Sequence, residues 1–235
     1  MQALWCGSAD CVALLLLASA VARRLVELLG TGALAAKDEA MGALLCLADK
    51  EPSNQLAIAA GLVALLGTGT AESQEFVSRM LLQFAQGATN RRAIADAGAV
   101  RLLVQQIRIS GAETSLKARE LAASVLARLV NDPAGDPADN VSKVASSGGI
   151  KALLMLLCTG SGRAESRAAY VLGTMARSSR EIQQRIISEG GVEPLVRMLS
   201  EGTSLEARVT PAAALQSTLR PWDRRVPPPR GSVEA

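Results

Sequence analysis

The amino-acid sequence predicts an all-α solenoid, a stack of about five helical repeats. Hydrophobic residues make up 49% of the 235 residues, but aromatic residues make up only 2%. Leu, Ala, Val and Ile must therefore fill the interior, which favours closely packed helices over a β-sheet rich in large aromatic side chains. A phrase of the form L-V-x-L-L also recurs, with its period of roughly 42 residues typical of solenoids built from two or three helices per unit. The phrase begins at Leu25, Leu62, Leu103, Leu153 and Leu195.

Three of the units align without gaps and show how each unit is organised. They are NRRAIADAGAVRLLVQQI (90–107), NVSKVASSGGIKALLMLL (140–157) and IQQRIISEGGVEPLVRML (182–199). Each predicts a short helix, a turn and a second helix, and the turn needs a glycine that tolerates positive φ, namely Gly98, Gly148 or Gly190. A polar loop and a third, longer amphipathic helix follow, as in RAAYVLGTMA (167–176). The expected repeats are residues 7–53, 54–89, 90–139, 140–181 and 182–220.

Departures from the repeat locate its loops and ends. The second repeat is about four residues short before Leu62, so we expect its first two helices to be fused. The glycine-rich stretches at 67–73 and 160–166 stand where other units have inter-helix loops, and we interpret them as loops rather than phosphate-binding sites. Residues 221–235 are rich in Pro and Arg and are expected to form a disordered tail. Two acidic pairs are expected to begin helices, where carboxylates interact favourably with the helix dipole: Asp38 with Glu39, and Glu72 with Glu75.

The composition excludes several kinds of site. The chain has no histidine, which rules out Ser-His-Asp and Cys-His nucleophiles and Cys₂His₂ zinc sites formed by this chain alone. Its net charge of +3 comes without a Lys/Arg block or an aromatic platform, so nucleic-acid binding is not expected. The apolar run CVALLLLASA (11–20) is too short to span a bilayer, which needs about 20 residues. We therefore expect no cofactor, no metal and no transmembrane segment.

The cysteines indicate the compartment. Cys6, Cys11, Cys46 and Cys158 form no C-x-x-C pair, and three of them lie among Leu and Ala on predicted helices. We expect buried, reduced thiols rather than disulfides or a redox site. Asp10 precedes the apolar run and no Lys or Arg occurs in the first ten residues, which argues against a signal peptide. The expected location is cytoplasmic, with the nucleus left open.

The phased phrases and three-helix units resemble the armadillo-repeat family, and the resemblance covers residues 1–220. It implies a right-handed superhelix whose third helices line a concave groove. Members of that family commonly bind extended peptides or partner proteins in the groove and do not usually catalyse reactions. The resemblance therefore implies a non-enzymatic protein-interaction scaffold.

Certain positions of the third helices form a row across the repeats, and by the resemblance this row, here called the ladder, faces the groove. In the fourth repeat the ladder residues share one helix face because they are three and four residues apart. An ordinary solvated surface is the alternative interpretation. The ladder consists of Glu39, Gly42, Cys46 and Asp49; Phe76, Arg79, Gln83 and Gln86; Leu121, Ser124, Arg128 and Asn131; and Arg167, Tyr170, Thr174 and Arg177. The candidate partner-binding residues are Arg79, Gln83, Ser124, Arg128, Arg167, Tyr170, Thr174 and Arg177.

The charge of the ladder predicts the kind of partner. It changes from acidic in the first repeat to basic in the third and fourth, so we expect an acidic or phosphorylated peptide whose most negative portion meets Arg128, Arg167, Tyr170 and Arg177. The family's best-known peptide binders carry Trp and Asn at positions held here by other residues, so recognition of nuclear-import signals through an Asn ladder is not expected. Two alternatives stay open. One is an enzyme that relies on carboxylates, Lys or Cys. The other is a fragment of a larger ubiquitin-ligase substrate-recruiting or vacuole-tethering armadillo protein, because the chain begins within a repeat.

Overall fold

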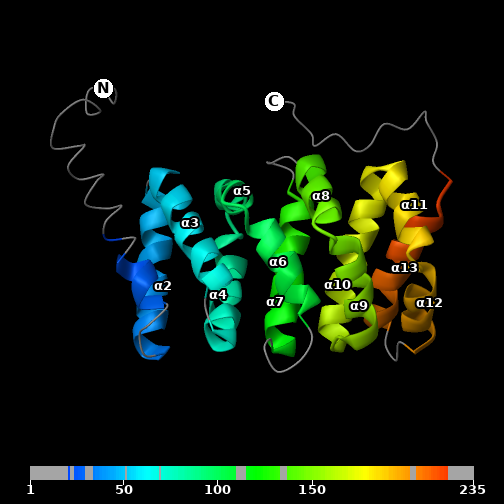
Figure 1. The fold of residues 1–235 in the computed structure, drawn as a ribbon, viewed down its shortest axis with the longest axis horizontal. Helices are drawn as coiled ribbons and strands as arrows, with labels where there is room; N and C mark the ends of the chain where they lie inside the picture. The colour runs from blue at the N-terminus through cyan, green and yellow to red at the C-terminus, as the bar shows by residue number, and fades with distance from the viewer. Residues whose placement is uncertain are drawn as a thin grey trace. The chain divides into compact units, whose positions relative to one another are not determined.

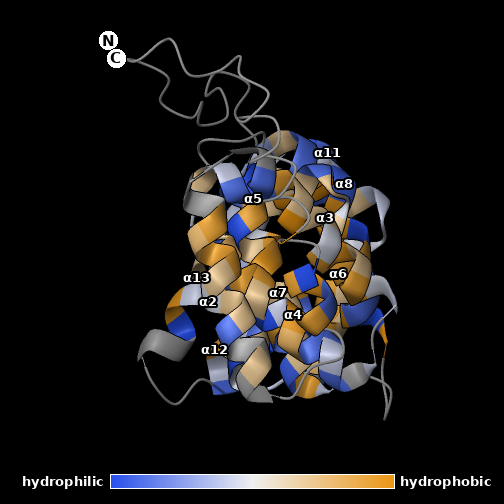
Figure 2. Ribbon diagram, turned by 90° about the vertical axis from the view of Figure 1, so that its left-hand side faces the viewer, coloured by the Kyte–Doolittle hydropathy of each residue, from blue (hydrophilic) through white to orange (hydrophobic). Residues whose placement is uncertain are grey.

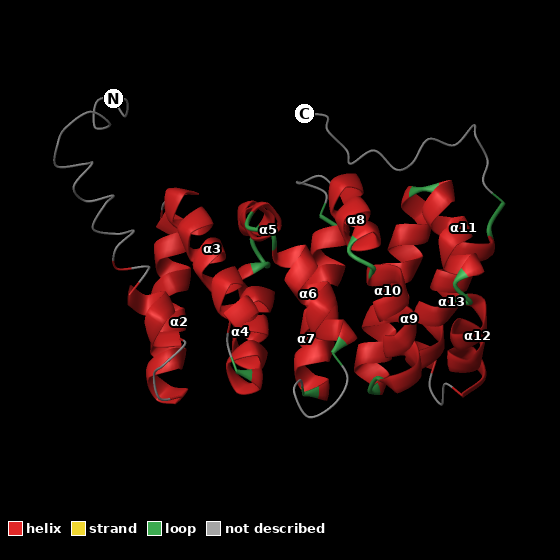
Figure 3. Cartoon of the chain, in the orientation of Figure 1, coloured by secondary structure: helices red, strands yellow, loops and turns green. Residues whose placement is uncertain are grey.

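The structure is a computed structural model that describes residues 21, 24–29, 34–50, 52–68, 70–109, 115–132, 137–201 and 205–221. These residues are helical apart from short turns and caps, and none of them forms a strand (Figure 3), which confirms the predicted all-α class. The chain divides into two compact units, Met1–Ala97 and Gly98–Ala235. The division falls at the predicted turn residue Gly98. The predicted tail lies outside the described residues from residue 222 onward.

The first unit is organised around one long helix, α3. Its helices are α2 (Leu34–Lys50), α3 (Pro52–Thr68), α4 (Ala71–Phe84) and α5 (Ala88–Asp96). Helix α3 contacts α2, α4 and α5, and it runs unbroken for 17 residues. This confirms that the second repeat fuses its first two helices. The stretch from Leu56 to Leu62 is dominated by Ala and Leu, which are strong helix formers, and lacks the left-handed glycine turn of the other repeats.

The second unit repeats a three-helix arrangement (Figure 1). Its helices are α6 (Ala99–Arg108), α7 (Leu116–Val130), α8 (Pro137–Ser146), α9 (Gly149–Thr159), α10 (Gly162–Ser178), α11 (Arg180–Ser188), α12 (Val192–Glu201) and α13 (Leu205–Leu219). The third helices of successive repeats pack together, α7 against α10 and α10 against α13. The second helices do the same, α6 against α9 and α9 against α12. Contacts between equivalent elements of successive repeats are the defining feature of a solenoid.

Glycines make the turns between first and second helices, as predicted. Gly98, Gly148 and Gly190 have φ values of 82°, 78° and 81°, in the left-handed region that disfavours side chains with a β-carbon. A β-carbon at Gly148 would meet nothing within 4 Å. The glycine is therefore required there by backbone conformation and not by lack of space.

Four of the five recurring leucines lie in the core, and Leu25 is half-buried. Leu62, Leu103, Leu153 and Leu195 are each at most 2% exposed, and burying one leucine side chain contributes about 1.5–3 kcal/mol. The helices of the described residues carry both hydrophobic and hydrophilic residues along their length (Figure 2). Amphipathic helices such as α6 therefore bury one face, whereas α7 is buried over most of its surface.

In the second and fourth repeats, a buried asparagine joins the repeat to the third helix of the repeat before it. The Nδ2 group of Asn54 donates to the carbonyl oxygen of Leu47 at 3.2 Å, and Nδ2 of Asn140 donates to that of Leu129 at 3.0 Å. Both carbonyls lie in the last turn of their helices, where carbonyl groups lack partners within the helix. Asn54 and Asn140 are 2% and 5% exposed. These asparagines therefore hold a structural position in the repeat, which the sequence prediction overlooked.

Two acidic pairs were expected at helix starts. The structure contradicts the pair Asp38 and Glu39, and of the pair Glu72 and Glu75 it places only Glu72 in a first turn. Helix α2 begins at Leu34 and has no acidic residue in its first turn, so the prediction for Asp38 and Glu39 is wrong. The residues before Asp38 are good helix formers and extend the helix toward its N-terminus. Glu72 does lie in the first turn of α4, which Thr70 caps by accepting a hydrogen bond from the backbone N–H of Ser73.

Candidate functional site

The ladder residues of the second unit lie on α7 and α10, which pack side by side. Both helices begin at a serine N-cap, because Ser115 and Ser161 accept hydrogen bonds from backbone N–H groups of the first turn. Arg128 on α7, and Arg167 and Arg177 on α10, are exposed. The two helices hold the same position in successive repeats, so together they present three arginine side chains to solvent.

Hydrogen bonds fix the guanidinium group of Arg177. Its Nη2 donates to Oγ1 of Thr174 at 3.1 Å, and its Nη1 donates to Oγ of Ser217 on α13 at 3.2 Å. Thr174 is only 9% exposed, and its hydroxyl donates to the carbonyl oxygen of Tyr170 at 3.0 Å. A guanidinium has five N–H donors, so Arg177 keeps donors for an acceptor outside the chain. Thr174 and Ser217 orient Arg177 and do not present free hydroxyls.

The other ladder residues of the second unit differ in how available they are. Neither Arg128 nor Arg167 forms an ion pair with any residue that the structure describes. Ser124 and Tyr170 are half-buried, and the Ser124 hydroxyl donates to the carbonyl oxygen of Glu120 at 2.9 Å. Arg128 and Arg167 are therefore exposed and unpaired among the described residues, whereas Ser124 and Tyr170 are only partly accessible.

In the first unit, Arg79 and Gln83 are exposed on α4. Arg79 pairs with Glu75 at 3.2 Å on the same helix, so part of its charge is already compensated. Phe76 and Leu121, which were expected to face solvent at the start of their ladder segments, are 5% and 6% exposed. These two positions belong to the core because an apolar side chain there gains more from packing than from exposure.

The acidic end of the ladder is only partly described. Glu39, Gly42 and Cys46 are exposed on α2, as expected for a surface row. The side chain of Asp49 lies outside the described residues. Among the described side chains, the acidic character of the ladder in the first repeat therefore rests on Glu39.

The sequence prediction also missed Arg119, a buried cation on α7. Arg119 is 4% exposed, and its Nη2 donates to Oγ1 of Thr159 at 2.8 Å. Its Nε has no hydrogen-bond partner among the described residues. Burial lowers the pKa of the Arg119 guanidinium from its ordinary value. Its neighbours in sequence, Lys117 and Glu120, form an ordinary surface ion pair, so the local pattern gives no signal that Arg119 points inward.

The cysteine prediction needs a correction. Cys46 and Cys158 are free thiols, and both are exposed, so the expectation that they are buried is wrong. Each lies on the solvent side of an amphipathic helix, where the surrounding Leu and Ala residues of the sequence face the other way. Cys6 and Cys11 lie outside the described residues.

The described residues contain no cluster of three or more His, Cys, Asp or Glu side chains able to hold a metal ion. Within the same part of the chain, no single helix is long and apolar enough to cross a membrane, although α8 and α9 together would pass by length and composition as a pair bent by 78°.

Comparison with known proteins gives structural relatives. No family model matches the chain, and no curated protein matches it in sequence. An engineered protein is 27% identical, with a TM-score of 0.66 over 90% of this chain and 84% of the other. A second engineered protein is 29% identical and also has a TM-score of 0.66, but the match covers only 51% of that longer chain.

Designed armadillo repeat proteins are also among the relatives. One of them, solved in complex with the peptide (KR)4, has a TM-score of 0.66 at 20% identity, over 90% of this chain and 87% of the other. Another matches equally well, with a TM-score of 0.65 at 20% identity. At this level of identity the likeness concerns the fold. The chain therefore has the fold of armadillo-type repeat proteins, as the phased phrases of its sequence predicted.

Proposed function

We propose that the chain is a non-enzymatic protein-interaction scaffold that binds an extended acidic or phosphorylated peptide of a partner protein on the ladder residues of α7 and α10. The exposed arginines on these neighbouring helices carry the proposal. The fold supports it, because a designed armadillo relative binds the peptide (KR)4. In this chain the ladder would serve the same kind of recognition with a different ligand chemistry.

The positive charge of the ladder on α7 and α10 favours an anionic peptide over a cationic one. The eight ladder positions of α7 and α10 contain three arginines and no carboxylate. A lysine-arginine peptide such as (KR)4 would meet like charge on these two helices. A carboxylate or phosphate group would instead accept charge-assisted and bidentate hydrogen bonds from the guanidinium groups.

The chemistry of each side chain suggests its role. Arg128 and Arg167 supply unpaired guanidinium groups, and Arg177 supplies one that is held in place by Thr174 and Ser217. Tyr170, which is half-buried and three residues after Arg167 on α10, would pack its ring against a peptide side chain. Exposed ion pairs contribute about 0.2–1 kcal/mol each and are screened by salt. The binding should therefore be of modest affinity and should weaken as ionic strength rises.

A charge-reversal experiment tests this function. The double variant Arg128→Glu with Arg167→Glu is compared with the native chain in quantitative pulldowns of partner proteins at increasing salt. A matched control, Lys151→Glu with Arg180→Glu, makes the same change of charge at two exposed positions outside the ladder. We expect the ladder variant to lose its specific partners and the control to keep them. If both variants retain every partner with unchanged salt sensitivity, the arginines are only a solvated surface.

We also propose a cytoplasmic location. The exposed thiols of Cys46 and Cys158 are free, and free exposed thiols suit a reducing compartment. Fluorescence microscopy of a tagged chain tests this location. Secretion of the chain into the medium would contradict it.

A further inference from the structure

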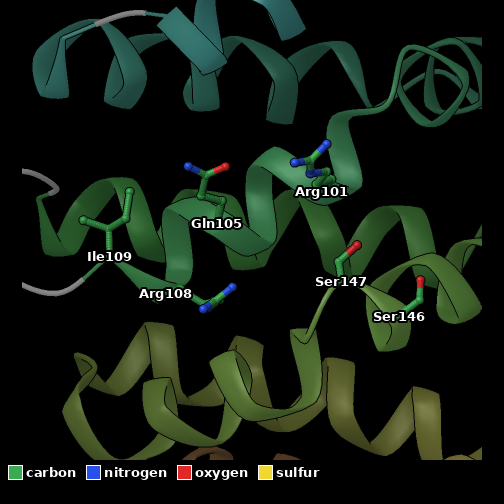
Figure 4. A pocket seen from close by; sticks show the side chains of 6 residues that line it. All are labelled: Arg101, Gln105, Arg108, Ile109, Ser146 and Ser147. Atoms are coloured by element: carbon green, nitrogen blue, oxygen red, sulfur yellow. The ribbon is translucent and has the colours of Figure 1, made fainter.

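A cavity lies between α6 and the end of α8, on helices that carry none of the ladder residues. Its volume is about 550 Å³, within the range of about 300–1,000 Å³ that is common for ligand sites. Figure 4 shows Arg101, Gln105 and Arg108 along α6, with Ser146 and Ser147 at the end of α8. All the lining residues belong to the second unit.

The lining of this cavity is basic and polar apart from Ile109. Arg101 and Arg108 are exposed, and neither forms an ion pair with a residue that the structure describes. No carboxylate lines the cavity. The hydroxyl of Ser146 already donates to the carbonyl oxygen of Lys143 at 3.1 Å, which leaves the Gln105 amide and the Ser147 hydroxyl as neutral hydrogen-bonding groups. Two positive charges with neutral groups near them favour an anionic ligand.

The spacing of the two arginines indicates the shape of that ligand. Arg101, Gln105 and Arg108 are separated by four and three residues, so they share one face of α6. Seven residues of α-helix rise about 10.5 Å, so the two guanidinium groups can each bind a separate anionic group of one ligand. A peptide in the polyproline II conformation repeats every three residues with a rise of about 9.3 Å. Acidic side chains three residues apart on such a peptide therefore project on the same side at nearly the spacing of the two arginines.

We propose that this cavity is a second binding site, which takes an extended segment of a partner protein carrying two acidic side chains three residues apart. One acidic group pairs with Arg101 and the other with Arg108. Gln105, between them, hydrogen-bonds to the peptide backbone, which is not hydrogen-bonded internally in this conformation. The proposal rests on residues distinct from the ladder and does not depend on the function proposed for α7 and α10.

The test uses NMR titration of the isotope-labelled full chain with three synthetic peptides. The first, Pro-Glu-Pro-Pro-Glu-Pro, has the required spacing; the second has Gln in place of both Glu residues; the third, Pro-Pro-Glu-Glu-Pro-Pro, keeps the charge but places the two Glu residues next to each other. We expect the first peptide to shift the amide signals of α6 and of Ser146 and Ser147, and to bind about fivefold or more tightly than the other two. Equal binding of the first and third peptides would overturn the spacing argument.

Variants locate the site. Arg101→Glu with Arg108→Glu should abolish these shifts, and the milder pair Arg101→Gln with Arg108→Gln should weaken binding while leaving the helical circular dichroism unchanged. The ladder variant Arg128→Glu with Arg167→Glu should leave the shifts of α6, Ser146 and Ser147 as they are in the native chain. Loss of binding in the ladder variant alone would place the peptide on α7 and α10 and overturn the cavity site. Inorganic phosphate that competes as well as the peptide, at equal concentration, would show that the cavity takes a small anion and would likewise overturn the proposal.

Discussion

Replacing Gly173 with alanine tests how closely α10 and α13 approach each other. A β-carbon added at Gly173 would lie 2.9 Å from Cα of Ala214 and 3.2 Å from its Cβ, whereas carbon atoms in favourable contact are about 3.5–4.0 Å apart. The nearer atom belongs to the backbone of α13. No side-chain rotation relieves that contact, so the two helices must separate for the alanine to fit.

Two opposing effects set the magnitude. Overpacking of this kind costs about 1–3 kcal/mol, while replacing a glycine inside a helix with alanine gains at most about 1 kcal/mol. We expect Gly173→Ala to lower the free energy of unfolding by about 1 kcal/mol, which corresponds to a fall in Tm of about 2–4 °C for a chain of this size. The matched control is Gly162→Ala on the same helix, where an added β-carbon would meet nothing within 4 Å. That variant should be neutral or stabilising.

The assay is thermal and urea unfolding followed by far-UV circular dichroism. Repeat proteins can unfold in parts, so hydrogen exchange of α10 and α13 should accompany it and show the loss of protection in these helices. Ala214→Gly removes the contact with Cβ but not the one with Cα, so it should cost less in the Gly173→Ala background than in the native chain, where it only introduces a glycine inside α13. If Gly173→Ala stabilises the chain as much as Gly162→Ala does, α10 and α13 do not approach each other closely at Gly173.

Three other predictions concern stability. Arg119→Met removes a buried charge but keeps much of the apolar stem of the side chain. Urea unfolding should therefore show a free energy of unfolding that is unchanged or raised, by up to about 4 kcal/mol. A large loss of stability would show that the guanidinium is needed. Asn140→Ala leaves the carbonyl group of Leu129 without its donor and should cost about 1–3 kcal/mol, whereas the exposed control Asn131→Ala should stay within about 0.5 kcal/mol; equal effects would contradict the capping role. Burial raises the pKa of Glu165 above its ordinary value of 4.5, against an opposing effect of Arg197. The folded chain therefore holds this proton to higher pH than the unfolded chain, and stability is lost as the pH rises through the folded pKa. Glu165→Gln should consequently be more stable than the native chain at pH 7, and unfolding at a series of pH values should show the gain disappear below the ordinary pKa; a gain that is the same at every pH would refute this.

The sequence predicted the fold because repetition supplies the same signal several times. Leu62, Leu103, Leu153 and Leu195 recur in phase and are all buried, and the turn glycines sit at one fixed position of the repeat with positive φ. The fused helix α3 was also predictable, since a missing turn leaves a measurable shortening of the repeat. Errors in a single helix, such as the start of α2, do not disturb a pattern carried by several units.

The side chains of the surface were harder to predict because periodicity assigns a face and not an environment. Phe76 and Leu121 fall on the ladder by spacing, but both are buried by neighbouring helices. Arg119 is a charged residue by composition, yet packing encloses it. The pairing of Arg177 with Ser217 joins residues 40 positions apart on different helices. Such contacts depend on the packing of repeats, which a linear pattern does not contain.

The central claim is that α7 and α10 bind an extended acidic peptide, and selection from a random peptide display library measures it most directly. We predict that peptides enriched on the native chain are rich in Asp and Glu and are released by raised salt. The Arg101→Glu with Arg108→Glu variant, which removes the second site, should still enrich acidic peptides, and adding Arg128→Glu with Arg167→Glu to that variant should abolish the enrichment. Enrichment of Lys- and Arg-rich peptides, or acidic peptides still enriched on the variant with all four changes, would contradict the account.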